Sequence, residues 1–505
     1  MNSDKIIIVG GGSAGWMTAS TLIKAYPEKD ITVIESPNIP TISVGESTIA
    51  RVKHWTKFLE IDEKQFLKEC DGIIKLSIKF TDFYKKGEAF HYPFGIPSTE
   101  GNQADINDWW FKKELWPETP NSDYAECMWP VMAMVNQNKL TEDDFHTFSF
   151  DADTAYHFDA TKFGLWLRDN YCLPRGVKHI QEDITDIETD EDGIKSLNGK
   201  HNADLYIDCT GFKSLLLGET LKEPFESLED MLPNNSAWAT RMPYTNREEE
   251  LVPYTNCTAI ENGWVWNIPL WDRIGTGYVY SDKFVDDETA LKEFKRHLGR
   301  DDLEFKNIKM KTGIHRRLFV KNVAAVGLSA GFIEPLESNG LFSIHEFVIE
   351  LIRNLRRGTI SQWDKDNYTA SCKWIFNTFA EFVGSHYALS HRNETEYWKA
   401  NNNKEWSPDI IDQTPKSYGY PYFVYNRNRE FVFPTNTGFH AIAAGMNWAP
   451  TDITALKYFN RWTYEQVYNE KIDAVAKLNQ KKHQWIEDAK HLPNVLDYLK
   501  ENIYK

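Results

Sequence analysis

One stretch near the start of the chain limits the possible folds more than any other. Residues 6–16 read IIIVGGGSAGW, so an aliphatic strand runs directly into Gly10, Gly12 and Gly15, and residues 17–23 then predict a helix. In GxGxxG spacing the first glycine permits a tight turn, the second lets the backbone approach a pyrophosphate, and the third lets the helix pack closely on the strand. N–H groups at the start of the helix would hold the phosphates.

A second strand completes the pattern. Residues 31–34 (ITVI) are aliphatic and end in Glu35, at the roughly twenty-residue distance where an acidic side chain reaches a ribose hydroxyl. The order of strand, glycines, helix, strand and acid predicts a dinucleotide site in an α/β fold. The alternative is a βαβ turn that binds nothing.

Charge and cysteine usage exclude several classes of function. The 505 residues carry a formal net charge of −17, which disfavours nucleic acid or an anionic membrane as a partner. The six cysteines show no CxxC and no zinc spacing, so we expect no metal site and the reduced thiols of a cytoplasmic protein. Because the first strand begins within the first few residues, we expect no signal sequence, and no apolar run reaches the roughly 18 residues of a membrane span.

Two further strands carry residues of chemical interest. Residues 76–81 (LSIKFT) alternate between apolar and polar, with Lys79 on the face shared by Lys75, Ser77 and Thr81, a pattern that by itself favours a solvated lysine. Residues 263–269 (GWVWNIP) place two tryptophans on one face of a strand, either as a cross-strand aromatic cluster or as the lining of a substrate tunnel. Residues 87–130 are aromatic and rich in Pro and Asn, and we expect long functional loops there.

A second strand-to-helix connection follows later in the chain. The strand VAAVGL at 323–328 leads through FIEPLESNG at 332–340 into a predicted helix over 341–357. Glu337 to Gly340 would lie at the N-terminus of this helix, where N–H groups attract anions and where Ser338 or Asn339 suits the N-cap. The alternatives are a simple capping cluster and a ligand site.

These motifs together resemble the flavin-dependent halogenases of the tryptophan halogenase family. GGGSAGW at 10–16, GWVWNIP at 263–269 and FIEPLESNG at 332–340 occur in the family's order, and Lys79 stands in an IKF context like that of its catalytic lysine. The motif resemblance extends to about residue 350. It implies an FAD-binding α/β fold of the p-hydroxybenzoate hydroxylase-like type, with a second β-rich layer and a helical C-terminal cap.

The resemblance also implies how FAD is bound and supplied. The implied cofactor-binding residues are Gly10, Gly11, Gly12, Ser13, Ala14, Gly15, Glu35, Ile42, Glu46, Ile184 near the adenine, Leu328 near the isoalloxazine, and Leu341. No second GxGxxG is present for a nicotinamide, which agrees with reduced FAD arriving from a separate flavin reductase. We expect residues 1–371 to form the FAD module with its interleaved substrate sheet, and residues 372–505 to form the mainly helical cap.

The reaction implied by the resemblance is halogenation of an electron-rich aromatic. Reduced FAD, O2 and chloride, bromide or iodide yield hypohalous acid, which reaches Lys79 through a tunnel. Glu337 orients the halogen or takes the proton that leaves the ring. The remaining implied residues are Asn339 and Gly340 for the halide, Phe94 and Ser338 for the substrate, and Trp264, Trp266 and Pro269 for the signature that keeps substrate away from the flavin.

The substrate end departs from the family pattern. Family members that act on free tryptophan carry a lid with a glutamate and a Phe-Trp pair, where this chain has Arg429 and Phe433-Pro434. A bare indole, another aromatic compound or a broad substrate range therefore stay open, as does a homo-oligomeric state. The alternative functions are a flavin-dependent hydroxylase of the same fold and a non-catalytic FAD-binding protein.

Overall fold

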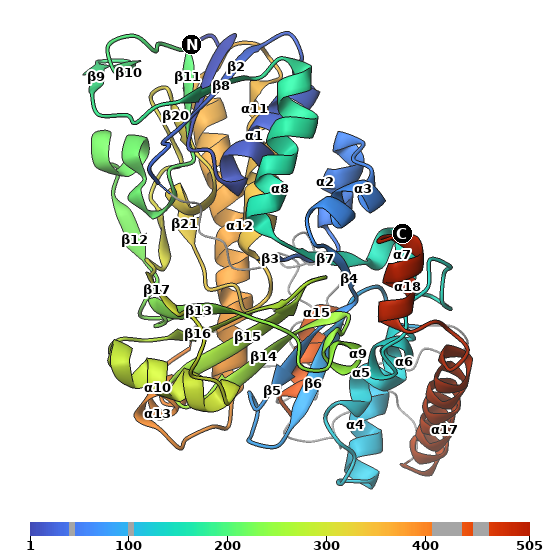
Figure 1. Ribbon diagram of the computed structural model, residues 1–505. Helices are drawn as coiled ribbons and strands as arrows, with labels where there is room; N and C mark the ends of the chain where they lie inside the picture. Colours follow the sequence, from blue (N-terminus) through green and yellow to red (C-terminus); the bar gives the residue numbers. More distant parts are fainter. Residues whose placement is uncertain (40–45, 99–105, 407–436, 448–463) are drawn as a thin grey trace.

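The computed structural model describes residues 1–39, 46–98, 106–406, 437–447 and 464–505 (Figure 1). Ile42 and the lid positions Arg429, Phe433 and Pro434 lie outside the described residues. At the top of Figure 1 the first sheet has the order β19-β20-β11-β1-β2-β8 within the described residues. Its strands are β1 (Lys5–Val9), β2 (Asp30–Glu35), β8 (Lys178–Gln181), β11 (Leu205–Asp208), β19 (Phe319–Val320) and β20 (Val323–Ala325).

The core strands of this sheet are parallel. β1 pairs in parallel with both β2 and β11, and Ile6, Ile7, Ile8 and Val9 are all buried. Continuous aliphatic runs of this kind are typical of parallel strands covered on both faces. The predicted strand, glycine loop and helix are therefore confirmed, with helix α1 spanning Ser13–Ala25.

A second sheet lies below the first in Figure 1 and has the order β17-β13-β16-β15-β14-β5-β6 in the described part of the chain. β14 and β5 pair in parallel, and the other neighbours are antiparallel. The strands are β5 (Ser77–Thr81), β6 (Ala89–Pro93), β13 (Ser236–Met242), β14 (Tyr254–Ile260), β15 (Gly263–Pro269), β16 (Ile274–Tyr280) and β17 (Lys306–Lys309). This is the expected second β-rich layer, and it carries both Lys79 and the double-tryptophan strand.

Smaller sheets and the helices complete the described structure. The sheet β3-β7-β4 joins Glu46–Ser47, Ala155–Phe158 and Ile73–Lys75, the sheet β12-β18-β21 joins Phe225–Ser227, Gly313–His315 and Gly331–Phe332, and β9 (Ile187–Asp190) pairs with β10 (Gly193–Leu197). The helices are α1, α2 (Val52–Leu59), α3 (Glu63–Glu69), α4 (Ile106–Leu115), α5 (Asp123–Met128), α6 (Val131–Asn136), α7 (Phe150–Asp153), α8 (Ala160–Trp166), α9 (Arg247–Glu250), α10 (Asp287–Leu298), α11 (Gly340–Leu355), α12 (Gln362–Ala388), α13 (Glu396–Asn402), α15 (Thr437–Gly445), α17 (Tyr464–Ala489) and α18 (Val495–Asn502). Short 3₁₀ or π turns are η1 (Leu167–Cys172), η2 (Leu173–Arg175), η3 (Gly211–Lys213), η4 (Leu215–Thr220) and η5 (Gly327–Ser329).

Two long helices connect the two main sheets. α11 packs against α1 beside the first sheet, and α12 packs against α11 and extends down to the second sheet (Figure 1). α12 is unbroken from Gln362 to Ala388, so the expected domain boundary between residues 371 and 372 falls inside a helix. An FAD module over 1–371 and a cap over 372–505, as expected from the sequence, would therefore share this element.

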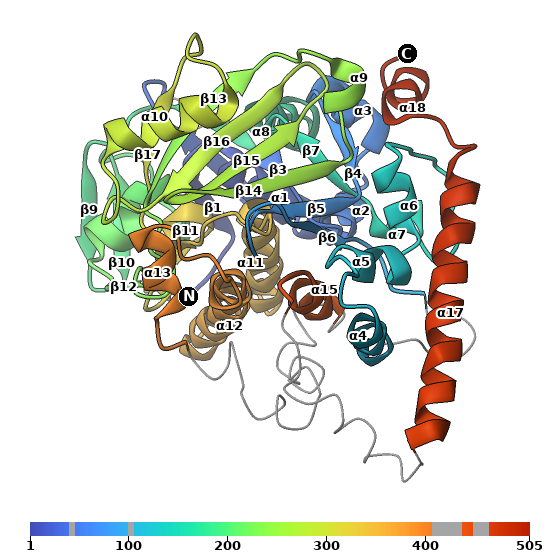
Figure 2. The same cartoon turned by 90° about the horizontal axis from the view of Figure 1, so that it is seen from below.

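The region 87–130 differs from the expectation of long loops. It contains β6 and the helices α4 and α5, and α17 packs alongside α4, α5 and α6 (Figure 2). Trp109 and Trp110 are buried in α4, so these rings stabilise a helical packing layer rather than a flexible loop. No helix in the described residues is long and apolar enough to cross a membrane.

Candidate active site

The glycine loop has the geometry of a dinucleotide cradle. Gly10 has φ +113°, and a Cβ there would lie 2.2 Å from the carbonyl oxygen of Cys209. A Cβ on Gly15 would lie 1.9 Å from the oxygen of Gly10, so the third glycine permits the close helix packing that the motif predicts. Gly12 occupies the N-cap of α1, where no side chain accepts a bond from the helix, and open space surrounds its Cα. The residues present therefore fit a pyrophosphate.

Glu35 lies beside this cradle at the end of β2. A Cβ on Gly11 would fall 1.6 Å from Oε2 of Glu35, so glycine at position 11 makes room for the carboxylate. Nε2 of His179 lies 2.6 Å from Oε1 of Glu35 and fixes its orientation. This position fits the predicted contact with a ribose hydroxyl.

The other predicted cofactor residues differ in how far their side chains are exposed to solvent. Gly327, with φ +76°, brings the turn η5 against Ala14, and the neighbouring Leu328 is 36% exposed, which leaves its side chain available to a flat ring. Ile184 is half-buried, whereas Leu341 is buried in the core at the start of α11. Ser13 donates from Oγ to the carbonyl of Ala160.

A different lysine from the expected one occupies the centre of the site. Lys75 is completely buried, and its Nζ lies 2.8 Å from each of Ser47 Oγ, Thr48 O and Ser338 Oγ. Lys79 is half-buried, with Nζ 5.8 Å from the centroid of the Tyr254 ring. The structure therefore brings Lys75, rather than the predicted Lys79, to Ser338.

The separation of the two lysines follows from sheet pairing. The strand does not continue through Leu76: Lys75 ends β4, which pairs with β7, whereas Lys79 lies in β5, which pairs with β14 and β6. The alternating pattern placed both lysines on one strand face, and the break at Leu76 assigns them to different sheets. Burial lowers the pKa of Lys75 from 10.5 to about 7, and Cys257 and Glu337 act in the opposite direction.

A chain of polar side chains leads away from Lys75. Ser47 Oγ lies 2.6 Å from Thr255 Oγ1, and Thr255 lies 2.8 Å from Nε2 of His157, whose Nδ1 lies 3.0 Å from the carbonyl of Pro269. The carbonyl can only accept, so Nδ1 donates to it. Burial and the charge of Lys75 hold the pKa of His157 well below its usual range, so Nε2 accepts. The hydroxyls then donate toward His157, and Ser47 presents its oxygen to Lys75.

Glu337 is the second buried ionisable group of the site. It is 1% exposed, and its Oε1 lies 2.8 Å from Nε2 of His386, a histidine of α12 that is fully buried. Burial raises the pKa of Glu337, while His386 and Lys75 lower it. Cys257, Tyr92 and Lys75 all have electrostatic interactions with Glu337. The carboxylate thus contacts the histidine and interacts electrostatically with the lysine.

The predicted anion site has the expected position but not the expected capping. Asn339 occupies the N-cap of α11, and its side chain accepts no bond from the helix, while its Oδ1 is buried without a hydrogen-bond partner among the described residues. Ser338 has φ +58°, a left-handed conformation that costs a serine on the order of 1 kcal/mol. A Cβ on Gly340 would meet Glu46 Oε2 at 3.8 Å. The first turn of α11 therefore offers N–H groups to an anion beside Glu46.

The tryptophan strand is tied to the loop that carries Glu337. Trp264 and Trp266 have ring centroids 6.1 Å apart, and Nε1 of Trp264 donates to Oε2 of Glu334 over 2.7 Å. Asn234 and Tyr387 donate to the same oxygen over 2.7 and 2.9 Å. Three donors on one buried carboxylate hold the indole of Trp264 in a fixed orientation.

Phe94 lies next to Lys75. Its ring centroid is 5.0 Å from Nζ of Lys75, and its N–H donates to the carbonyl of Leu76 over 3.0 Å. The predicted substrate residues Phe94 and Ser338 thus both lie next to Lys75.

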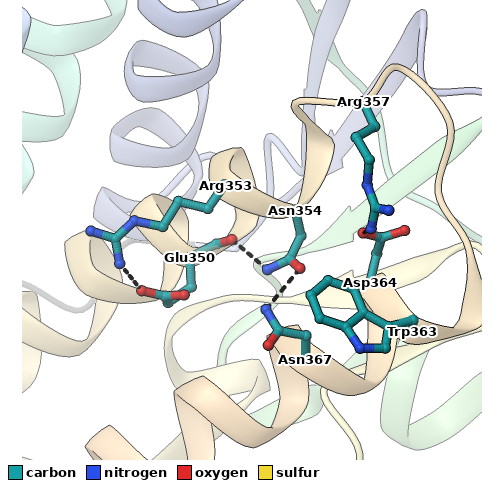
Figure 3. A pocket seen from close by; sticks show the side chains of 7 residues that line it. All are labelled: Glu350, Arg353, Asn354, Arg357, Trp363, Asp364 and Asn367. Atoms are coloured by element: carbon teal, nitrogen blue, oxygen red, sulfur yellow. Dashed lines mark hydrogen bonds and ion pairs between the residues drawn. The ribbon is translucent and has the colours of Figure 1, made fainter.

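A separate surface pocket occupies the far end of α11. Figure 3 shows its lining, in which Arg353 pairs with Glu350 and Arg357 pairs with Asp364. Its volume is about 600 Å³, and its full lining is Glu350, Arg353, Asn354, Arg357, Trp363, Asp364 and Asn367. The charges there are satisfied by each other, and the pocket lies at the opposite end of α11 from Asn339 and Gly340.

The fold and the site together define the class of protein. A parallel sheet with a glycine-loop cradle, a second sheet that carries two neighbouring tryptophans, and a buried lysine that interacts electrostatically with a buried carboxylate fit an enzyme that binds a dinucleotide cofactor. A sequence profile described as tryptophan halogenase matches residues 5–458, and the chain belongs to that family. The protein is thus a flavin-dependent halogenase, an enzyme of the oxidoreductase class.

Individual relatives agree with this assignment. The chain is 32% identical to the tryptophan 6-halogenase SttH of Streptomyces toxytricini, covering 84% of this chain and 88% of the relative. It is 30% identical to the tryptophan 7-halogenase RebH of Lentzea aerocolonigenes, and the alignment covers 88% of this chain and 90% of the relative. The apo structure of VirX1 superposes with a TM-score of 0.89 at 36% identity and covers 100% of this chain and 99% of that one.

Several site residues were missed by the sequence analysis. Lys75 was visible only as a neighbour of Lys79, and His157, Thr255, Ser47 and His386 stand in no recognisable motif. Their one common signal is polarity inside an apolar stretch, as in IIKL or FVGSHYA, and such residues are more often satisfied core groups than active-site groups.

Proposed function

We propose that the chain halogenates an electron-rich aromatic compound with reduced FAD, O2 and halide, and that Lys75 and Glu337 are the catalytic pair. The observation that carries the assignment is the buried Nζ of Lys75, 2.8 Å from Ser338 Oγ and electrostatically coupled to Glu337. Bound FAD, when reduced, supplies with O2 the oxidising equivalent that converts halide into hypohalous acid. Every later step belongs to side chains of this protein.

The role of Lys75 follows from its environment. A pKa of about 7 leaves the amine poised between its charged and neutral forms near neutral pH. In the charged form it donates a hydrogen bond to hypohalous acid and polarises the oxygen–halogen bond. In the neutral form its lone pair carries the halogen as a haloamine. Ser47 and Thr48 hold Nζ in place for either role.

Glu337 acts on the aromatic ring. Attack of the ring on the halogen forms the carbon–halogen bond and leaves the ring cationic, and loss of the ring proton to Glu337 restores aromaticity. The halogen's former oxygen leaves as water after protonation, so the reaction is ArH + HOX → ArX + H2O. Burial of Glu337, which raises its pKa, strengthens the carboxylate as a proton acceptor.

The remaining roles follow from position. The N-terminus of α11, with Asn339 and Gly340, suits the halide, and Phe94 suits the face of an aromatic substrate beside Lys75. We propose an indole-type substrate, because SttH and RebH are tryptophan halogenases. A separate reductase supplies the reduced flavin, and six buried, unpaired cysteines suit a compartment such as the cytoplasm that keeps thiols reduced.

A paired substitution tests the lysine. Lys75→Ala and Lys79→Ala are incubated with FAD, a flavin reductase, NADH, mixed halides and a library of indoles, phenols and pyrroles, and products are identified by mass spectrometry. We expect Lys75→Ala to lose halogenation by at least ~100-fold while reduced flavin is still oxidised, and Lys79→Ala to retain most activity. Loss of activity in Lys79→Ala alone would return the catalytic role to Lys79. Products that carry only oxygen would indicate the hydroxylase instead.

A further inference from the structure

The geometry points to His386 as the positioning residue of Glu337: it binds one carboxylate oxygen, shares a proton with it and leaves the other oxygen free to receive the ring proton. This inference rests on the proposed function, because it concerns the step in which the ring loses its proton. It gives a residue of α12 a role in a site whose lysine lies in β4 and whose carboxylate lies in the loop before α11.

The two ring nitrogens of His386 have different partners. Nδ1 lies 3.0 Å from the carbonyl oxygen of Phe382, and a carbonyl only accepts, so Nδ1 carries a hydrogen. Nε2 lies 2.8 Å from Oε1 of Glu337. The contact with Phe382, one turn earlier in the same helix, holds the ring with Nε2 next to the carboxylate, at ion-pair distance but outside hydrogen-bond geometry.

Both partners are isolated from water. His386 is 0% and Glu337 is 1% exposed, and the rings of Phe80, Phe83 and Phe382 lie 4.7, 6.3 and 5.5 Å from the imidazole centroid. A lone buried charge is costly, whereas a carboxylate and an imidazole that share one proton form a pair of zero net charge. The aromatic enclosure thus favours a single proton between Nε2 and Oε1.

Other charged and titratable groups face this pair from neighbouring elements. Lys75 of β4, Tyr92 of β6 and Cys257 of β14 interact electrostatically with Glu337, and Glu334 interacts with His386. Lys75 and His386 favour the carboxylate form of Glu337, while burial favours the acid. Removal of His386 therefore removes one of the two groups that keep Glu337 ionised.

The second carboxylate oxygen of Glu337, Oε2, is available to receive the ring proton. Both oxygens of Glu337 are buried and accept no hydrogen bond in the described part of the chain, but Oε1 lies at ion-pair distance from Nε2 of His386, whereas Oε2 has no such contact. When the carbon–hydrogen bond of the halogenated ring breaks, its electron pair returns to the ring and the proton goes to Oε2. The proton on Nε2 stays with His386 and holds Oε1 in place during the transfer.

The test uses His386→Gln and His386→Phe in the full-length holoenzyme. The side-chain amide of glutamine places an N–H where Nε2 lies but cannot titrate, whereas phenylalanine removes the donor. We expect His386→Phe to lower kcat for halogenation by about 10- to 100-fold with little change in KM, and to move the acid limb of the pH profile upward by about one unit. His386→Gln restores most of kcat and the original acid limb.

His345→Gln is the matched control. His345 is a buried histidine in α11 that lies next to Glu346 instead of Glu337. A general effect of removing a buried imidazole would lower stability in both variants but leave the acid limb in place. An acid limb that is the same in wild type and His386→Phe would overturn the inference.

A second readout does not depend on turnover. In protein labelled with ¹⁵N-histidine and free of flavin, Glu337→Gln should change the Nε2 resonance of His386 and leave its Nδ1 resonance in the protonated range. An unchanged Nε2 resonance would show that no proton is shared and would overturn the inference. If wild type halogenates nothing, the proposed function fails and the inference fails with it, whereas a halogenating wild type with these negative results refutes His386 alone.

Discussion

Burial is the property that distinguishes Lys75 from the other lysine considered for catalysis. A lysine that loses its water normally requires a carboxylate in direct contact, but three oxygens of Ser47, Thr48 and Ser338 surround Nζ instead. Neutral acceptors stabilise the ammonium less than a carboxylate does, so the amine can reach its neutral form. The site thereby holds a reactive amine at the expense of folding stability.

The loss of folding stability caused by burying Lys75 depends on pH. The pKa of Lys75 is about 7 in the folded protein, whereas an unfolded lysine has its ordinary value of 10.5, so the unfolded state binds more protons between these values. The free energy of unfolding of wild type therefore rises with pH in this window, by up to about 1.4 kcal/mol per pH unit. In Lys75→Met this contribution disappears, and the stability advantage of the variant narrows from pH 7 to pH 10.

Urea denaturation of wild type and Lys75→Met at pH 7, 8.5 and 10 checks this expectation. Lys79→Met serves as the matched control, because Lys79 is only half-buried. A difference in unfolding free energy between wild type and Lys75→Met that stays constant over this range would mean that Lys75 remains charged when folded.

At the scale of elements, the N-terminus of α11 combines two opposing charges. The helix end attracts an anion, while Glu46 on β3 faces Gly340. Burial, and to a smaller extent Asp159, raises the pKa of Glu46 from 4.5 to about 7, so the carboxyl is neutral below this pH and charged above it. A charged Glu46 repels a halide at the same helix end.

Halide affinity should therefore weaken as the pH rises through about 7. In wild type the apparent KM for bromide increases from pH 6 to pH 8.5, and in Glu46→Gln, whose side chain stays neutral, it stays nearly constant. Steady-state halogenation at varied bromide concentration measures both. An equal pH dependence of the apparent KM for bromide in the two proteins would show that Glu46 does not affect halide binding.

Local and long-range structure differ in how far the sequence predicts them. The β1, glycine loop, α1 and β2 unit was predictable, because strand, turn and helix signals lie within a single continuous segment. Lys75 was not, because its environment depends on the pairing of β4 with β7 and on contacts with Ser47 and Ser338 from distant segments. His386 reaches Glu337 only through the packing of α12 against α11, which no local pattern encodes.

At the scale of the whole molecule, the loop before α11 meets the second sheet where Trp264 donates to Glu334. The FAD-binding sheet leads through β20 and η5 into the loop that carries Glu334 and Glu337, and the indole of Trp264 belongs to the second sheet. The hydrogen bond between them therefore ties the loop that carries Glu334 and Glu337 to the second sheet. This contact is suited to a barrier that keeps the aromatic substrate away from the flavin but lets hypohalous acid pass.

Weakening this barrier should reduce the coupling between oxidation of the reduced flavin and halogenation of the substrate. Trp264→Phe keeps an aromatic ring but loses the N–H, so one of the three donors to Glu334 disappears and the ring gains freedom. Loss of a hydrogen bond to a buried charge costs about 1.5–3 kcal/mol. We expect the amount of halogenated product formed per reduced flavin consumed to fall several-fold, because hypohalous acid escapes to an external trap.

Trp238→Phe is the control, since Trp238 lies in the same sheet and donates to the carbonyl of Asp287 instead. Coupling that falls equally in both variants would mean that general loosening of the sheet, rather than the Trp264–Glu334 contact, controls the passage of the acid.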